Sequence, residues 1–197
     1  MSHAAPTTLP PIAELNTASA TVQDLATAVT LLFEPAPPLV ERLFAKRPFS
    51  SYGQLIDETE ALITDPAKAG FTEAEVLEII NAHPRIGAAK ANLSALSLIE
   101  QGYKKPEEAA AAAAQQTQQQ VSQEDEKTQA DLKRLNQEYE AKYGFKFIVF
   151  VNGRPRSAIV PVMEERIRDS TVEQEKKTAL LDMCHIARDR LKKLNVE

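Results

Sequence analysis

Three histidines are available for proton-transfer chemistry, and His83 has the most unusual setting of the three. His3 lies in the N-terminal stretch, and His185 lies among charged and apolar residues of the last predicted helix. His83 is followed by Pro84, and because a residue before proline avoids helical geometry, we expect the imidazole on a constrained loop. Such an imidazole can give or take a proton near neutral pH. The structural alternative is a histidine that contacts the last carbonyls of a helix, and the residue types alone favour it.

A second group of polar side chains lies in the segment Ser97-Leu98-Ile99-Glu100-Gln101. Positions three and four apart share a face of a helix, so Ser97, Glu100 and Gln101 are predicted to converge. A hydroxyl, a carboxylate and an amide would then be available together. The alternative is the ordinary solvated face of an amphipathic helix, and spacing alone favours it.

Four arginines near the C-terminal half of the chain are candidates to bind a substrate carboxylate through their fork of donors. These are Arg154 and Arg156, which follow an apolar run, and Arg188 and Arg190 on the last predicted helix. Exposed arginines that only improve solubility are the commoner case.

The apolar run itself, from Phe145 to Val151, is the clear departure from helical character. It is rich in β-branched and aromatic residues and ends at Asn152-Gly153, which predicts a short buried extended segment closed by a turn. We find no second strand in the sequence to pair with it. Because unpaired backbone groups need partners, the segment is a candidate wall for a ligand.

The elements that would position these residues are predicted to be helices almost throughout. The chain has six glycines and no tryptophan, and it is rich in Ala, Leu, Glu, Lys and Gln. Capping boxes mark four helix starts, at Thr21 to Asp24, Ser51 to Gln54, Thr72 to Glu75 and Ser170 to Glu173. Apolar residues recur between them at helical spacing, which predicts an all-α, multi-helix bundle.

A chain of 197 residues with 43% hydrophobic content predicts one domain. We expect a flexible N-terminus over residues 1–20 and a helical domain over 21–197. Pro35, Pro37 and Pro38 are predicted to open a helix over 39–46. An Ala/Gln-rich stretch near 105–129 is made of good helix formers and predicts a long solvated helix.

The charge pattern and the cysteine content exclude several classes of protein. The formal net charge is −5 and basic residues are scattered among acidic ones, so we expect no nucleic-acid partner. We expect no membrane partner, because no apolar run reaches about 18 residues. Cys184, the single cysteine, excludes an internal disulfide and a cysteine zinc site, and its expected place is the core. We expect a cytosolic protein, with the peroxisome as the alternative, since the C-terminus lacks a Ser-Lys-Leu type of peroxisomal signal.

Five segments occur in an order that resembles one known family. They are Leu32-Phe33-Glu34-Pro35, Arg47-Pro48-Phe49, His83-Pro84, Ser97-x-x-Glu100-Gln101, and Tyr143-Gly144-Phe145-Lys146-Phe147-Ile148. Each is a weak signal alone, but the ordered set resembles the 2-oxo-4-hydroxy-4-carboxy-5-ureidoimidazoline (OHCU) decarboxylases of uric-acid breakdown. The resemblance runs from about Ala26 to Leu194.

The resemblance implies an all-helical homodimer that acts on a small-molecule substrate with no metal or organic cofactor. It implies that His83 is the catalytic histidine and Glu100 its acidic partner. It further implies that the substrate is bound by Pro84, Ser97, Gln101, Arg190 and the backbone of Phe147, Ile148, Val149, Phe150 and Val151.

Two features depart from the family pattern. The stretch 101–129 is longer and richer in Ala and Gln, and Asn152 stands where many members have an arginine, for which Arg154 is a candidate replacement. Two alternatives follow: a lapsed enzyme that binds a small molecule without turnover, and a helical interaction module in which His83 and Glu100 are incidental.

Overall fold

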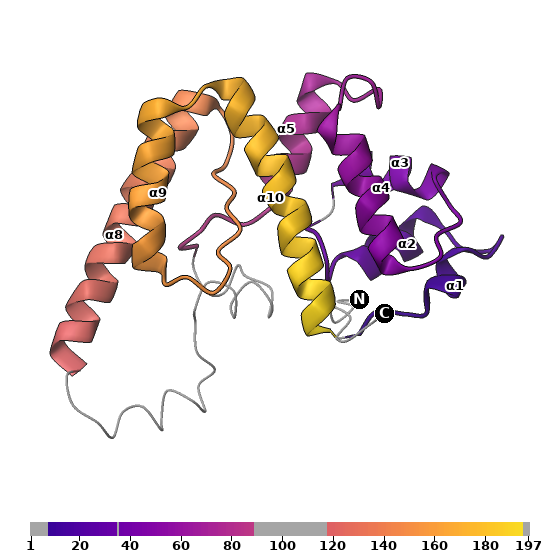
Figure 1. The fold of residues 1–197 in the computed structure, drawn as a ribbon, viewed down its shortest axis with the longest axis horizontal. Coiled ribbons are helices and arrows are strands. Elements are labelled where there is room, and N and C mark those ends of the chain that lie inside the picture. Colours follow the sequence, from indigo (N-terminus) through magenta and orange to yellow (C-terminus); the bar gives the residue numbers. More distant parts are fainter. Residues whose placement is uncertain (1–7, 35, 89–117, 195–197) are drawn as a thin grey trace. The chain divides into compact units, whose positions relative to one another are not determined.

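The computed structural model describes residues 8–34, 36–88 and 118–194, with the side chains of 118–124 left out. These residues form eight α-helices and no β-strand, which confirms the predicted all-α class (Figure 1). The helices are α1 (Ile12–Leu15), α2 (Val22–Val29), α3 (Pro37–Ala45), α4 (Tyr52–Thr64), α5 (Glu73–Ala82), α8 (Gln118–Tyr143), α9 (Arg156–Asp169) and α10 (Val172–Lys193).

The chain divides into two compact units. The first unit combines the residues up to 83 with those from 176 onward, and the second comprises residues 84–175. The boundary on the C-terminal side falls within the first turns of α10.

The first unit is built around α3, which contacts α2, α4 and α5. Each helix buries one apolar stripe, and burial of these side chains is the main term that stabilises the unit. The buried side chains include Leu25, Phe33, Leu39, Leu43, Tyr52, Leu55, Ile56, Ile79 and Ile80. Cys184 of α10 is also buried, as expected.

Residues 8–20, part of the N-terminal stretch expected to be flexible, form hydrogen bonds with α4 and with the turn before it. Tyr52 donates a hydrogen bond from its hydroxyl to the carbonyl of Pro10 at 2.7 Å. The side chain of Asn16 forms two hydrogen bonds with the backbone of Phe49, at 2.7 and 2.9 Å. These contacts join the segment to α4 and to the turn before it, and sequence patterns do not report such distant partners.

The predicted helix starts are correct at three of the four positions. Thr21 with Asp24 and Thr72 with Glu75 form complete capping boxes, and Ser51 caps α4 through the backbone N–H of Gln54. The box predicted at Ser170 to Glu173 is wrong by one residue. Thr171 and Gln174 exchange the two hydrogen bonds instead, at 3.0 and 3.3 Å.

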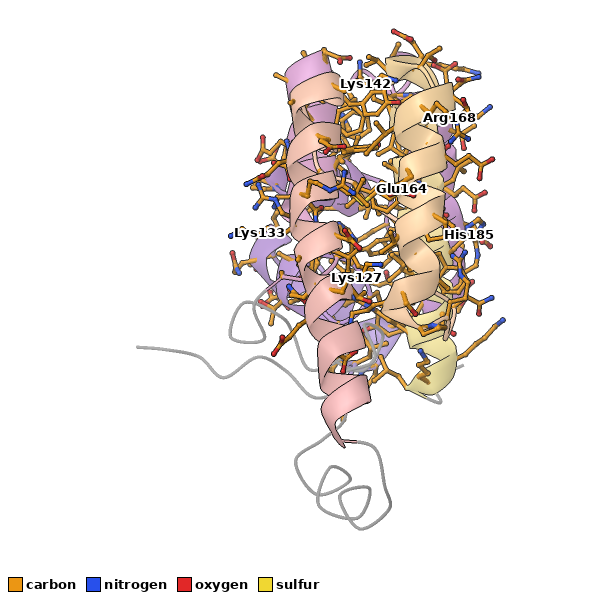
Figure 2. The ribbon with its side chains drawn as sticks, turned by 90° about the vertical axis from the view of Figure 1, so that its left-hand side faces the viewer. Lys127, Lys133, Lys142, Glu164, Arg168 and His185 are labelled. Atoms are coloured by element: carbon orange, nitrogen blue, oxygen red, sulfur yellow. The ribbon has the colours of Figure 1, made fainter. Side chains whose placement is uncertain are left out.

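In the second unit α8 and α9 pack side by side, with side chains filling the space between them (Figure 2). They run in the same direction, because Arg156 at the start of α9 contacts Gln129 while Tyr143 at the end of α8 bonds to the carbonyl of Arg166. The connecting residues 144–155 therefore return along the length of the pair (Figure 1). The predicted Ala/Gln-rich helix is described only from Gln118 onward, and residues 105–117 lie outside the described part.

No helix in the described ranges is both long and apolar enough to cross a membrane.

Candidate active site

His83 ends α5 with a non-helical backbone, at φ −71° and ψ 145°. This geometry confirms that Pro84 turns the chain out of the helix at His83. The side chain is buried, with 3% of its surface exposed. The apolar stripe of α5 therefore brings an ionisable ring into the interior at the point where the helix stops.

The residues that follow His83 are attached to one face of α8. Arg85 forms a forked ion pair with Glu140, which raises the pKa of the Arg85 guanidinium through the hydrogen bond between them. Asn136 donates to the carbonyl of Ile86 at 3.0 Å. Gln129 donates to the carbonyl of Gly87 at 2.5 Å. Each of the three successive residues Arg85, Ile86 and Gly87 is therefore bonded to a side chain of α8.

A cavity of about 310 Å³ lies between this loop and α8. It is lined by residues 85–88 and by Gln129, Lys133, Asn136, Gln137 and Glu140. Gly87 approaches α8 closely, because a Cβ built there would lie 3.2 Å from Cδ1 of Leu132. Asn136 and Gln129 position this loop, and the sequence analysis did not identify them because their partners are backbone carbonyls more than 40 residues away.

Arg190 is buried in the first unit, with 2% of its surface exposed. Its Nη1 lies 3.5 Å from Oε1 of Glu34 and 3.5 Å from the carbonyl oxygen of Leu32. Arg188 differs, since it is partly exposed and pairs with Asp57 and Glu60 of α4 at 2.8 and 2.5 Å. A buried guanidinium needs an anionic partner to offset the cost of its desolvation. This makes Arg190 a better candidate than Arg188 for binding an anion.

The predicted wall over Phe147–Val151 is non-helical and lies outside any strand in the described chain. Phe147, Ile148 and Val151 are buried, while Val149 and Phe150 are partly exposed. Its carbonyl groups accept hydrogen bonds from arginines rather than from a second strand. Arg154 donates to Phe150 and Val151 at 2.7 and 3.0 Å, and Arg166 donates to Ile148 at 3.0 Å.

Asn152 and Arg154 have local roles in the structure. Asn152 adopts a left-handed conformation with φ 50°, which asparagine tolerates better than arginine does, and Gly153 follows with φ 72°. Arg154 was a candidate replacement for the family arginine. Its Nε and one terminal nitrogen bind the wall carbonyls, which accounts for its presence after the turn.

An ion pair between the partly buried Arg166 and the buried Glu175 lies beside the wall, and neither residue was predicted from the sequence. Glu175 is 1% exposed and accepts hydrogen bonds from Arg166 and from the hydroxyl of Tyr139. Burial raises the pKa of Tyr139, and the hydrogen bond to Glu175 adds to the effect. Spacing gave no signal for this group because its members come from α8, α9 and α10.

The remaining predicted site residues are placed as follows. Pro84 is partly buried and belongs with the wall to the second unit, whereas His83 and Arg190 belong to the first. Ser97, Glu100 and Gln101 lie outside the described residues. The functional roles of all these residues stay predictions.

Comparisons with known proteins all point to one family. The model of the OHCU decarboxylase family matches residues 18–192. A 2-oxo-4-hydroxy-4-carboxy-5-ureidoimidazoline decarboxylase of Haloferax volcanii is 27% identical over 160 residues, which cover 81% of this chain and 82% of that protein. A uric acid degradation bifunctional protein of Bacillus subtilis is 28% identical over 169 residues, and the match spans only 30% of its length.

The fold has a counterpart among solved structures. A crystal structure of OHCU decarboxylase in the presence of (S)-allantoin aligns with a TM-score of 0.53, over 84% of this chain and 95% of that one. The sequence identity is 19%, so this likeness concerns the fold alone.

Proposed function

The chain belongs to the OHCU decarboxylase family, and we propose that it converts 2-oxo-4-hydroxy-4-carboxy-5-ureidoimidazoline to (S)-allantoin and carbon dioxide in urate degradation. The observation that carries the proposal is the extent of the family match, residues 18–192. That range includes every residue we assign to the site, from His83 to Arg190. The second activity of the longer bifunctional relatives is not part of this proposal.

The reaction breaks the bond between the substrate's ring carbon and its carboxylate. The electron pair stays on that carbon, delocalised into the neighbouring imine and carbonyl, until a proton is added to one face. The protein must therefore stabilise negative charge and supply the proton from a fixed direction.

We assign proton transfer to His83, which either removes the substrate hydroxyl proton or supplies the final proton, with Glu100 as the partner that orients its ring and keeps it basic. General acid–base catalysis of this kind typically contributes about 10²- to 10⁴-fold in rate. The burial of His83 at the end of α5 supports the assignment, because a buried ring delivers a proton along one direction.

We assign substrate binding to the remaining residues. Arg190 binds the carboxylate before it leaves, and Ser97 and Gln101 hydrogen-bond the ureido group and the ring. Backbone N–H groups of Phe147–Val151 meet the ring carbonyl where charge accumulates. The buried state of Arg190 supports its role, since an anion is bound more strongly where water is scarce.

The oligomeric state and the compartment are part of the same proposal. We expect a homodimer, which sedimentation analysis of the purified protein measures directly. We expect the cytosol as the compartment, which imaging of the tagged full chain tests.

The test of the function generates the unstable substrate in situ from urate and follows the circular dichroism of the allantoin formed. We expect rapid formation of one enantiomer with the protein present, and slow formation without it. His83→Ala should abolish the acceleration, and Arg190→Ala should chiefly raise KM. His185→Ala is the matched control because His185 is exposed and lies 3.4 Å from Asp182 on its own helix.

A rate equal to that of the blank would contradict the decarboxylase assignment and favour a protein that binds without turnover. The sequence argument for that alternative rested on Asn152. Its left-handed backbone gives a local reason for asparagine at this position.

A further inference from the structure

The ion pair between the partly buried Arg166 and the buried Glu175 has no part in the chemistry described above. Nη2 of Arg166 lies 2.6 Å from Oε2 of Glu175, and Nε lies 2.8 Å from the same oxygen. Nη1 donates a hydrogen bond to the carbonyl oxygen of Ile148 at 3.0 Å. The guanidinium also lies over the ring of Phe147, with Cζ 4.5 Å from the ring centre. One side chain therefore contacts two consecutive residues of the wall.

Stability alone is a weak reason for an ion pair with so little side-chain exposure to solvent, 14% for Arg166 and 2% for Glu175. The desolvation of both charges offsets most of their attraction, and apolar side chains of similar volume often stabilise a fold as well or better. A guanidinium differs from an apolar side chain in direction, because its donors form a planar fork. Here Nε donates to both carboxylate oxygens of Glu175, at 3.1 and 2.8 Å, and this orients Nη1 toward Ile148.

The hydrogen bond to Ile148 also determines where the next N–H group points. The peptide between Ile148 and Val149 is trans, so the Val149 N–H is antiparallel to the Ile148 carbonyl. Since that carbonyl faces Arg166, the Val149 N–H faces away from Arg166. Within the part of the chain that the structure describes, this N–H donates no hydrogen bond to the protein.

We propose that Arg166, oriented by Glu175, is a positioning residue of the active site that presents the Val149 N–H to the substrate. The inference rests on the proposed function, because it makes this N–H one of the wall donors that meet the developing charge. Preorganised donors act on the transition state more than on the ground state, so the effect falls on kcat more than on KM.

The experiment compares Arg166→Lys with Tyr139→Phe in the full-length protein. Lysine has one nitrogen, so it cannot bind Glu175 and Ile148 in the same geometry. Tyr139→Phe removes the 2.5 Å hydrogen bond to Glu175 but leaves the Arg166 contacts with Ile148 and Phe147 in place. Both variants change the cluster formed by Tyr139, Arg166 and Glu175. Only Arg166→Lys removes the hydrogen bond to the wall residue Ile148.

We expect Arg166→Lys to lower kcat about 10- to 100-fold per folded molecule, in the range seen when a catalytic group is displaced by about 1 Å. Its KM should change less, and Tyr139→Phe should keep the wild-type kcat. In nuclear magnetic resonance spectra of the wild type, the Val149 amide signal should move when (S)-allantoin is added. In Arg166→Lys that shift should be lost. If Arg166→Lys does not fold, Glu175→Gln takes its place, since it keeps the shape and removes the charge.

Equal kcat values in the wild type and in the folded Arg166 or Glu175 variant would overturn the inference. A Tyr139→Phe variant that loses activity to the same degree would also overturn it, because the group would then act only through packing. A wild type that fails to accelerate decarboxylation would overturn the proposed function itself, which distinguishes the two failures.

Discussion

Asn136 on α8 donates a hydrogen bond from its side-chain amide to the carbonyl oxygen of Ile86, three residues after His83, at 3.0 Å. The same amide nitrogen donates to the carbonyl of Leu132 at 2.7 Å. A buried side chain of α8 is thus attached to the loop that begins with the proposed catalytic histidine.

Asn136→Ala is expected to lower the free energy of unfolding by about 1–3 kcal/mol, because the buried carbonyl of Ile86 loses its donor. Urea denaturation followed by far-UV circular dichroism measures this change. Gln137→Ala is the control, since Gln137 is the exposed neighbour on α8. Equal stability of the Asn136 variant and the control would contradict a role for this hydrogen bond.

Gly87→Ala is expected to cost more stability than Gly70→Ala. Both glycines have a left-handed backbone, at φ 73° and 78°, so both variants pay a similar strain of about 1–2 kcal/mol. At Gly87 the new methyl group would also meet Leu132 at 3.2 and 3.3 Å, whereas nothing lies within 4 Å of it at Gly70. The difference between the unfolding free energies of the two variants measures the cost of the new contact with Leu132. A difference of zero would argue against a close approach of the loop to α8.

Glu34→Gln is expected to destabilise the first unit by about 1.5–3 kcal/mol, the usual range for a hydrogen bond to a charged group. The reason is that Arg190 is almost fully buried and loses the opposite charge 3.5 Å away. Glu58→Gln serves as the control, because Glu58 pairs with Lys46 at 3.9 Å near the surface. Such exposed pairs contribute about 0–1 kcal/mol. Thermal unfolding of both variants gives the comparison, and matching midpoints would contradict the argument.

Cys184 is expected to react slowly with a thiol reagent at pH 8 in the native protein and rapidly in denaturant. Burial raises the pKa of its thiol to about 12, with a smaller contribution from Glu60. The folded chain therefore retains this proton at a pH where the unfolded chain releases it. Stability from this group is complete below the ordinary pKa of 9.0 and is lost as pH rises toward 12.

The pH dependence is checked by urea denaturation between pH 8 and pH 11. The free energy of unfolding should fall with rising pH, and less steeply in Cys184→Ala than in the wild type. Fast labelling of the native thiol, or identical slopes for both proteins, would show that the thiol is accessible.

Local sequence determined much of the helical framework, because helix starts and stops depend on neighbouring residues. The capping boxes at Thr21 and Thr72, the break at His83-Pro84 and the non-helical run before Asn152 were all predicted from short segments. The error at Ser170 has the same origin. Two adjacent hydroxyl residues each had an acid or amide three positions on, and Ser170 is already the C-cap of α9, so Thr171 caps α10.

Only the tertiary structure decided which polar groups meet. Asn136 and Ile86 are 50 residues apart in the sequence. Arg166 of α9 bonds to Ile148, which lies in the segment that connects α8 to α9. Such pairs follow no helical period, since they join side chains to backbone groups on other elements. The sequence alone therefore indicated a helical decarboxylase with His83 at its centre, while the partners that position the loop and the wall emerged from packing. The physical reason is that buried polar groups must find hydrogen-bond partners wherever the folded chain supplies them.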